Sequence, residues 1–173
     1  MTRKGCAFVA DFDFERRDSG GMATIMARNG VDPRAVGKAL GLDAPAAPGR
    51  AADGLSLIGS GAGSWIAHQP DAAPTWADDV RDRLQGIAAV SDQSGAYIIF
   101  RLGGTGARTI LQRGVAIDLH PDRFGQGAAV TTAIAHIGAV IWVVDDRPTF
   151  DVAVYRSYAD SFEDWLTHAA AAL

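Results

Sequence analysis

Residues 130–155 read VTTAIAHIGAVIWVVDDRPTFDVAVY, and this stretch decides the fold. Two mainly apolar runs, 130–136 and 140–144, have the length of strands and are short for helices. A turn-forming Asp-Asp-Arg-Pro sequence follows at 145–148, and from 150 to 155 large apolar residues alternate with other residues at the period of a strand. The stretch therefore predicts three consecutive strands joined by turns, which is the pattern of an antiparallel sheet.

Short helices are predicted on both sides of this stretch from their start and stop signals. The four helices begin or end at these residues: Asp32-Pro33 and Gly41 for the first, Thr75 and Gly86 for the second, Ala107 and Gln112 for the third, and Asp160 in a D-x-x-E start for the last. The last helix would bury a stripe made of Phe162, Trp165, Leu166 and Ala169.

The remaining segments predict further strands and loops. They are a possible strand at 7–14, a helical turn or strand at 22–28, a surface loop at 43–53, a hairpin of 55–58 with 65–68, a hairpin of 90–92 with 96–102 around Ser94-Gly95, and irregular chain at 115–127. Strict alternation of strand and helix is missing, so we expect an α+β fold with a mixed, mostly antiparallel sheet and helices on one face. We expect one domain with two lobes, about 1–88 and 89–173.

The bulk composition is that of a soluble globular protein, with 173 residues, 48% hydrophobic residues, 21% charged residues and a net charge of −4. No basic block is present, which argues against nucleic acid and against a membrane-surface helix. The single cysteine, Cys6, cannot form an internal disulfide or a zinc-binding cluster and suits a reduced compartment. No apolar run reaches the length of a membrane span, so the cytoplasm is the expected location.

The chain shows no catalytic or metal-binding pattern. The glycines at 59, 61 and 63 follow a predicted strand, but strand-like sequence comes next, so a turn is favoured over a dinucleotide site. No pair among the histidines at 68, 120, 136 and 168 has metal-ligand spacing; His136 is expected on a strand and His168 on the polar side of the last helix. We therefore assign no catalytic, cofactor-binding or metal residue to this chain.

Three smaller patterns carry no function either. The adjacent carboxylates Asp145 and Asp146 lie in a turn and are expected to be solvated. No G-x-S-x-G nucleophile elbow is present. Lys4-Gly5-Cys6 matches a motif of folate-binding proteins only by its three letters, and its place near the N-terminus indicates a chance match.

Two motifs resemble those of a known family. Asp118-Leu119-His120-Pro121 with Phe124 matches its D-L-H-P-x-x-F pattern, and 156–166 matches its R-S-[FY]-A-x-x-[FLW]-x-x-W-L ending. In this order and spacing, the region from about residue 89 onward resembles the gamma subunit of heterotetrameric sarcosine oxidase. The resemblance implies a fold similar to the folate-binding domain of the glycine-cleavage T-protein and of YgfZ-like proteins.

The resemblance also implies a function. The chain would be a structural gamma subunit that packs mainly on the alpha subunit, in a complex with beta and delta subunits. FAD, FMN, NAD, zinc and tetrahydrofolate would be bound by the partner subunits and none by this chain. The complex would demethylate sarcosine oxidatively, form hydrogen peroxide and pass the one-carbon unit to tetrahydrofolate.

Five motif residues are candidates for structural or partner-contact roles: Asp118, His120, Phe124, Arg156 and Trp165. The proline after His120 disfavours helical geometry there, so the Asp118 and His120 side chains can bond backbone groups and fix a long loop. Arg156 could reach a carboxylate of this chain or of a partner, and both readings stay open.

Two other functions remain open. The chain could be the small subunit of an N-methylglutamate dehydrogenase complex, or a free-standing folate or small-ligand binding protein of T-protein type. Residues 57–66 lack the proline and glutamate that the sarcosine oxidase family often carries there, which leaves open which oxidase the chain serves. The sequence does not choose the N-methyl amino acid substrate, because the substrate would touch another chain.

Overall fold

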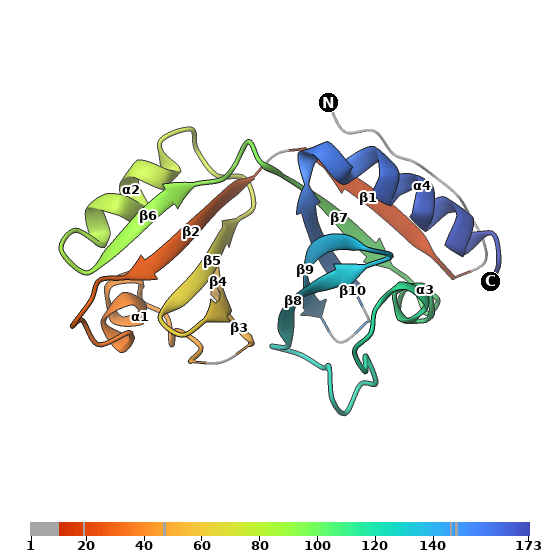
Figure 1. Ribbon diagram of the computed structural model, residues 1–173, viewed down its shortest axis with the longest axis horizontal. Coiled ribbons are helices and arrows are strands. Elements are labelled where there is room, and N and C mark those ends of the chain that lie inside the picture. The colour runs from red at the N-terminus through yellow and green to blue at the C-terminus, as the bar shows by residue number, and fades with distance from the viewer. Residues whose placement is uncertain (1–10, 19, 47, 146, 148) are drawn as a thin grey trace. The chain divides into compact units, whose positions relative to one another are not determined.

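The computed structural model describes residues 11–18, 20–46, 48–145, 147 and 149–173. The chance match at 4–6 and the first part of the predicted strand at 7–14 lie outside the described residues. Tertiary contacts divide the chain into two units (Figure 1). Of the described residues, unit 1 contains 11–18 and 97–173, and unit 2 contains 20–96.

Unit 1 is a five-stranded antiparallel sheet with the strand order β1-β7-β10-β9-β8. Its elements are β1 (Asp13–Arg17), β7 (Tyr97–Gly103), α3 (Ala107–Gly114), β8 (Ala129–Ile134), β9 (Ile137–Asp145), β10 (Thr149–Tyr155), the 3-10 turn η1 (Arg156–Tyr158) and α4 (Ala159–Ala170). The stretch 130–155 contains nearly all of β8, β9 and β10, so the prediction of three antiparallel strands is confirmed.

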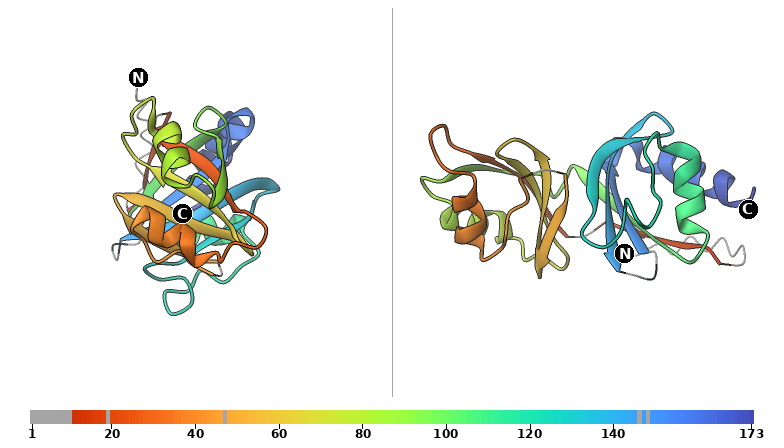
Figure 2. Two further views of the ribbon diagram at one scale, coloured as in Figure 1. Left: turned by 90° about the vertical axis from the view of Figure 1, so that its left-hand side faces the viewer. Right: turned by 90° about the horizontal axis from the view of Figure 1, so that it is seen from below.

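The core of unit 1 lies between one face of this sheet and the helices α3 and α4. Alternate strand residues such as Phe100 and Val152 point to that face and are fully buried against Ile110 of α3 and Phe162 of α4. The Phe100 and Phe162 rings meet edge to face, with centroids 5.0 Å apart. Burying a side chain of this kind contributes about 1.5–3 kcal/mol, so the apolar stripe of α4 holds that helix on the sheet. Figure 2 shows the path of α4 along the sheet of unit 1.

Unit 2 is a second five-stranded antiparallel sheet, with the strand order β3-β4-β5-β2-β6. Its elements are β2 (Gly21–Ala27), α1 (Arg34–Leu40), β3 (Arg50–Asp53), β4 (Leu55–Gly61), β5 (Ser64–Gln69), α2 (Trp76–Arg83) and β6 (Ala88–Asp92). Both helices cover one face of the sheet (Figure 2). On that face Trp65 and Leu57 pack with Val36 and Trp76. Two antiparallel sheets with helices on one face of each confirm the α+β prediction.

Several local predictions are also confirmed. Helix α1 follows Asp32-Pro33 and ends at Gly41, whose φ of 72° is the left-handed conformation that a glycine C-cap adopts. Residues 22–28, left open between helix and strand, contain most of β2. The predicted hairpin of 55–58 with 65–68 is the β4–β5 pair.

Other predictions were wrong. Strands β6 and β7 do not form a hairpin: β6 pairs with β2 in unit 2, and β7 pairs with β1 and β10 in unit 1. The predicted loop at 43–53 ends in β3, which pairs with β4. His136 lies in a turn after β8, with φ of 71°, because strand pairing ends where the chain reverses.

Candidate functional site

The first motif, Asp118 to Phe124, forms a loop that is held by its own hydrogen bonds. The Asp118 carboxylate accepts a hydrogen bond from the His120 backbone N–H at 2.8 Å. The His120 carbonyl accepts from the N–H groups of Arg123 and Phe124, both at 2.8 Å, and His120 Nδ1 accepts from Asp122 N–H at 3.3 Å. Such bonds from a side chain to nearby backbone fix an irregular segment without secondary structure.

Helix α3 is hydrogen-bonded to this loop through Gln112. Leu119 is fully buried, and its N–H donates to Gln112 Oε1 at 3.1 Å. Gln112 Nε2 in turn donates to the Ile117 carbonyl at 2.9 Å. The amide side chain of Gln112 thus pairs with one backbone N–H and one backbone carbonyl of the loop, as a neighbouring strand would do in a sheet.

Phe124 anchors the far end of the loop. Its side chain is 6% exposed and belongs to the core of unit 1. Arg108 of α3 donates to the Phe124 carbonyl at 3.2 Å and lies 5.0 Å from the centre of the Phe150 ring. Desolvation lowers the pKa of Arg108, although the guanidinium stays charged because an arginine starts from a very high pKa.

The side chains of Asp118 and His120 remain on the surface of this loop. The His120 side chain is 61% exposed and lies 3.5 Å from the Asp122 carboxylate. Within the described residues no group of three or more histidine, cysteine or acidic side chains is placed to hold a metal ion. The polar groups of Asp118 and His120 are therefore exposed, while the buried residues of the loop support the fold.

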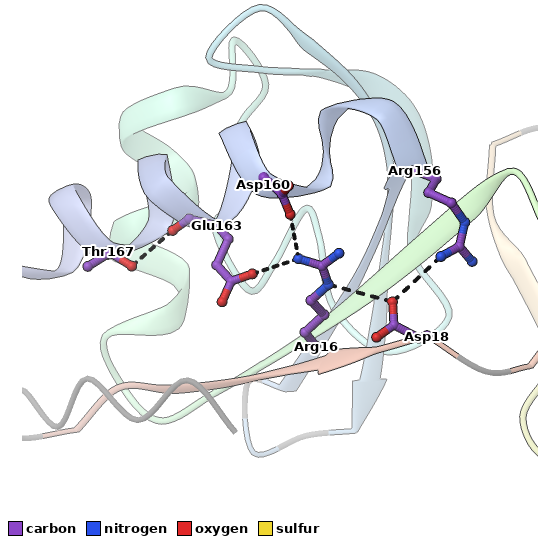
Figure 3. A network of polar contacts seen from close by, with 6 residues as sticks. All are labelled: Arg16, Asp18, Arg156, Asp160, Glu163 and Thr167. Carbon is purple, nitrogen blue, oxygen red and sulfur yellow. Dashed lines mark hydrogen bonds and ion pairs between the residues drawn. The ribbon is translucent and has the colours of Figure 1, made fainter. Parts of the chain in front are cut away.

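The second motif begins at the end of β10, where Arg156 opens the turn η1. Arg156 Nη1 lies 3.8 Å from Asp18 Oδ1, and that carboxylate oxygen also lies 3.6 Å from Arg16 Nε (Figure 3). Arg156 thus has a carboxylate neighbour within its own unit.

Arg16 is the centre of this charge network. Its Nη1 donates to Asp160 at 2.7 Å and to Glu163 at 2.9 Å, both on the first turns of α4 (Figure 3). The hydrogen bond to Asp160 is the main cause that raises the pKa of Arg16. The D-x-x-E pair, Asp160 and Glu163, lies in the first turns of α4, so the predicted start of the last helix is confirmed. Neither carboxylate caps the helix; both accept hydrogen bonds from Arg16 of β1 instead.

Trp165 connects α4 to α3. It stacks on Phe162 with ring centroids 5.7 Å apart, and its ring edge covers Gly114, the last residue of α3. A Cβ atom at Gly114 would lie 2.5 Å from Trp165 Cζ2, so the close approach requires glycine. The motif tryptophan therefore has a packing role inside unit 1.

An ion pair on the unit 1 sheet, with a buried carboxylate and a partly exposed guanidinium, was not predicted from the sequence. Asp151 of β10 is 2% exposed and faces its cross-strand neighbour Arg101 of β7. Arg101 Nε and Nη2 donate to the two carboxylate oxygens at 2.7 Å each. The single charged residue in the alternating run 150–155 was the available signal, but the partner lies fifty positions away and no local pattern indicates it.

The other polar candidates have local roles. His68 is buried in β5, with Nδ1 3.1 Å from the Gly21 carbonyl oxygen. His168 is exposed on α4, as predicted. The glycines at 59, 61 and 63 lie at the turn of the β4–β5 hairpin, and a strand follows them instead of a helix. The predicted turn is therefore confirmed.

Unit 2 contains a small hollow beside the start of α2. It has a volume of about 150 Å³, and its lining includes Gly21, Trp76, Asp92 and Ser94. The Asp92 carboxylate accepts a 2.6 Å hydrogen bond from the Ser94 hydroxyl, so these polar atoms are already paired. Trp76 Nε1 has no hydrogen-bond partner among the described residues and is closed off from the surface.

Comparison with known proteins adds the following similarities. The family model described as "Sarcosine oxidase, gamma subunit family" matches residues 27–172. Sarcosine oxidase subunit gamma of Corynebacterium sp. (strain P-1) is 26% identical over 152 residues, which cover 87% of this chain and 70% of that protein. The same subunit of Corynebacterium sp. (strain U-96) is 29% identical over 143 residues, which cover 78% of this chain and 67% of that protein.

Solved structures show the same fold. A chain of heterotetrameric sarcosine oxidase from Corynebacterium sp. U-96, in complex with pyrrole 2-carboxylate, superposes with a TM-score of 0.83 at 24% identity, over 92% of this chain and 84% of that one. Glycine cleavage system aminomethyltransferase T from Bartonella henselae superposes with a TM-score of 0.67 at 11% identity, over 91% of this chain and 45% of that one. The predicted likeness to the T-protein fold is thus confirmed.

Proposed function

Because the chain belongs to the sarcosine oxidase, gamma subunit family, we propose that it is the structural gamma subunit of a heterotetrameric sarcosine oxidase. The observation that carries this proposal is the family match, which extends from residue 27 to residue 172 and so covers most of each unit. The complex would demethylate sarcosine oxidatively, and this chain would contribute to its assembly.

The geometry of the two motifs supports a structural role. The buried residues of the first motif fix a loop on α3, and Trp165 of the second fixes α4 on α3. We propose that FAD, FMN, NAD, zinc and tetrahydrofolate are bound by the partner subunits, and that this chain binds none of them.

The exposed residues of the motifs are the proposed partner contacts. Asp118 and His120 project from a loop that the fold keeps fixed, so a partner can bind them without ordering flexible chain. We propose the alpha subunit as the main partner, with the beta and delta subunits in the same complex. The described part of the chain contains no helix of the length and hydrophobicity that a membrane crossing requires.

Co-expression tests this function directly. The chain, carrying an affinity tag, is expressed with the alpha, beta and delta subunits, purified, and assayed for flavin absorbance and for sarcosine-dependent peroxide. We expect all subunits to elute together with both signals, whereas the isolated chain gives neither. A chain that elutes alone and binds tetrahydrofolate would be a free-standing folate binder, and a complex that oxidises N-methylglutamate but not sarcosine would be the alternative dehydrogenase.

A surface variant tests the proposed partner contact. His120→Ala removes an exposed side chain whose one backbone hydrogen bond, from Asp122 N–H, is long, so we expect little change in the thermal stability of the isolated chain and lower recovery of the partner subunits. His168→Ala, which alters an exposed histidine of α4, is the matched control and should recover the partners fully. Equal recovery with both variants would remove His120 from the interface.

A further inference from the structure

The turn between β2 and α1 contains the only asparagine of the sequence, Asn29, and Gly30 follows it directly. Asparagine is a thermolabile residue, because the amide carbon of its side chain can react with the backbone nitrogen of the next residue. A glycine in the next position leaves that nitrogen most accessible, because glycine has no Cβ atom. The structure decides whether the two groups can meet.

The chain is held on both sides of this pair. On the side of β2, the Arg28 N–H donates a hydrogen bond to the Ile87 carbonyl at 3.0 Å. On the side of α1, the Asp32 carboxylate accepts a hydrogen bond from the Arg34 N–H at 2.9 Å. A rearrangement of Asn29 and Gly30 is therefore a local event between two fixed ends.

The pair itself lies in a turn that one hydrogen bond closes. The Val31 N–H donates to the Arg28 carbonyl at 3.0 Å, and Gly30 has φ of 79°, which is the conformation of a type II turn. Asn29 and Gly30 are both exposed. Among the hydrogen bonds of the described residues, none involves the Asn29 side chain or the Gly30 N–H. Water therefore reaches both reacting groups, and neither is occupied.

We propose that Asn29 is a site of spontaneous deamidation. The Gly30 nitrogen attacks Cγ of Asn29 and forms a new C–N bond, while the bond from Cγ to the amide nitrogen breaks. That nitrogen leaves as ammonia, together with the proton that the Gly30 nitrogen gives up. Water then opens the five-membered imide: addition at the side-chain carbonyl gives aspartate, and addition at the backbone carbonyl gives isoaspartate.

The turn slows this reaction without preventing it. Ring closure requires the peptide group between Asn29 and Gly30 to rotate out of the turn, which breaks the hydrogen bond from Val31 to Arg28. Opening one hydrogen bond of this kind lowers the rate about two- to tenfold relative to the unfolded chain. The hydrogen bonds that hold Arg28 and Arg34 can stay in place, so the rest of unit 2 need not unfold.

The products differ from the parent chain in charge and in backbone length. Each carries one new carboxylate, so the net charge changes from −4 to −5. Isoaspartate also inserts one extra atom into the backbone of the turn that precedes α1. Both differences can be measured on the full-length chain.

Ageing of the purified chain tests the proposal. The folded chain, and the same chain unfolded in guanidinium chloride, are incubated at mildly alkaline pH until half of the unfolded chain has reacted. Trypsin then releases residues 29–34, because arginines stand at 28 and 34. Mass spectrometry and chromatography of this peptide, against an unaged sample digested in the same way, measure asparagine, aspartate and isoaspartate.

The chain offers an internal control and a simple variant. Gln85 is also exposed and precedes Gly86, whose φ is 77°, but its longer side chain would have to close a six-membered ring. We expect aspartate and isoaspartate at position 29 of the folded chain, formed about two- to tenfold more slowly than in the unfolded chain. Gln85 should keep its amide, and Asn29→Gln should abolish the new acidic form in isoelectric focusing.

Three results would overturn the proposal. If position 29 of the folded chain reacts more than about a hundredfold more slowly than in the unfolded chain, which exceeds the effect of one hydrogen bond, the turn protects the asparagine. Aspartate without isoaspartate would indicate direct hydrolysis of the amide and no imide. Equal conversion of Gln85 would show that the reaction does not depend on ring closure with the following glycine.

Discussion

The contact between Trp165 and Gly114 allows one substitution to be predicted in detail. Gly114→Ala adds a single methyl group at the end of α3. In the present structure that Cβ would lie 2.5 Å from Trp165 Cζ2 and 2.8 Å from Ile134 Cγ2, both well inside van der Waals contact. Trp165 also stacks on Phe162, so the ring cannot turn away without losing that contact. We therefore expect the helix α4 to shift or the ring to move outward.

The size of the effect follows from two opposing contributions. Overpacking by a methyl group lowers the free energy of unfolding by about 1–3 kcal/mol, and exchanging glycine for alanine in a helix raises it by about 0.5–1 kcal/mol. Trp165 is only partly buried, which favours the lower half of the overpacking range. The free energy of unfolding should fall by about 1 kcal/mol, which for a chain of this length lowers Tm by about 2–4 °C.

Urea and thermal unfolding followed by circular dichroism measure this change. Gly138→Ala in β9 is the matched control, because no atom lies within 4 Å of its would-be Cβ, and it should leave stability unchanged or slightly raised. Trp165→Leu removes the ring edge, so Gly114→Ala should cost less in that background, where only the contact with Ile134 Cγ2 remains. The reasoning is refuted if Gly114→Ala is as stable as the control, or if its effect is the same with and without Trp165.

Three further outcomes are expected. Asp151→Asn should lower the free energy of unfolding by about 2 kcal/mol in urea unfolding, because it leaves a guanidinium without its buried carboxylate; a loss below about 0.5 kcal/mol would contradict this role. The turn at Ala135 and His136 has φ of 49° and 71°, as a type I′ turn requires. Ala135→Asn with His136→Gly should therefore raise stability by about 1 kcal/mol, and an unchanged or lower Tm would refute this. The hydroxyl of Ser94 is the main cause that lowers the pKa of Asp92, so the stability that Asp92 contributes is present above about pH 4 and is lost as the pH falls through its lowered pKa. The difference in unfolding free energy between the parent and Asp92→Asn should shrink over that range, and a constant difference down to pH 2 would count against it.

The sequence predicted the parts of the fold that depend on neighbouring residues. The alternation over 150–155 indicated β10, and the glycine at 41 indicated the end of α1. These signals are local, because side-chain periodicity and backbone conformation are set within a few residues. The motif residues could likewise be selected from their spacing, and Phe124 proved to be buried while His120 proved to be exposed.

Pairing between distant segments could not be predicted in the same way. Strand β1 pairs with β7, so that Phe14 faces Leu102, and β6 and β7 belong to different sheets although four residues separate them. Arg16 binds the carboxylates of α4, which lie more than 140 positions later in the chain. An alternating run shows that a strand has a buried face, but any strand with a compatible face can be its neighbour.

The stretch 130–155 by itself determined that this protein contains an antiparallel sheet, and the two motifs determined its family resemblance. Only the tertiary structure decided which residues of the motifs are buried, that Trp165 needs a glycine beneath it, and that the chain crosses twice between two units. The physical reason is the range of the interactions. Turns, caps and strand periods are fixed by adjacent residues, whereas burial and ion pairing depend on which distant surfaces meet and exclude water.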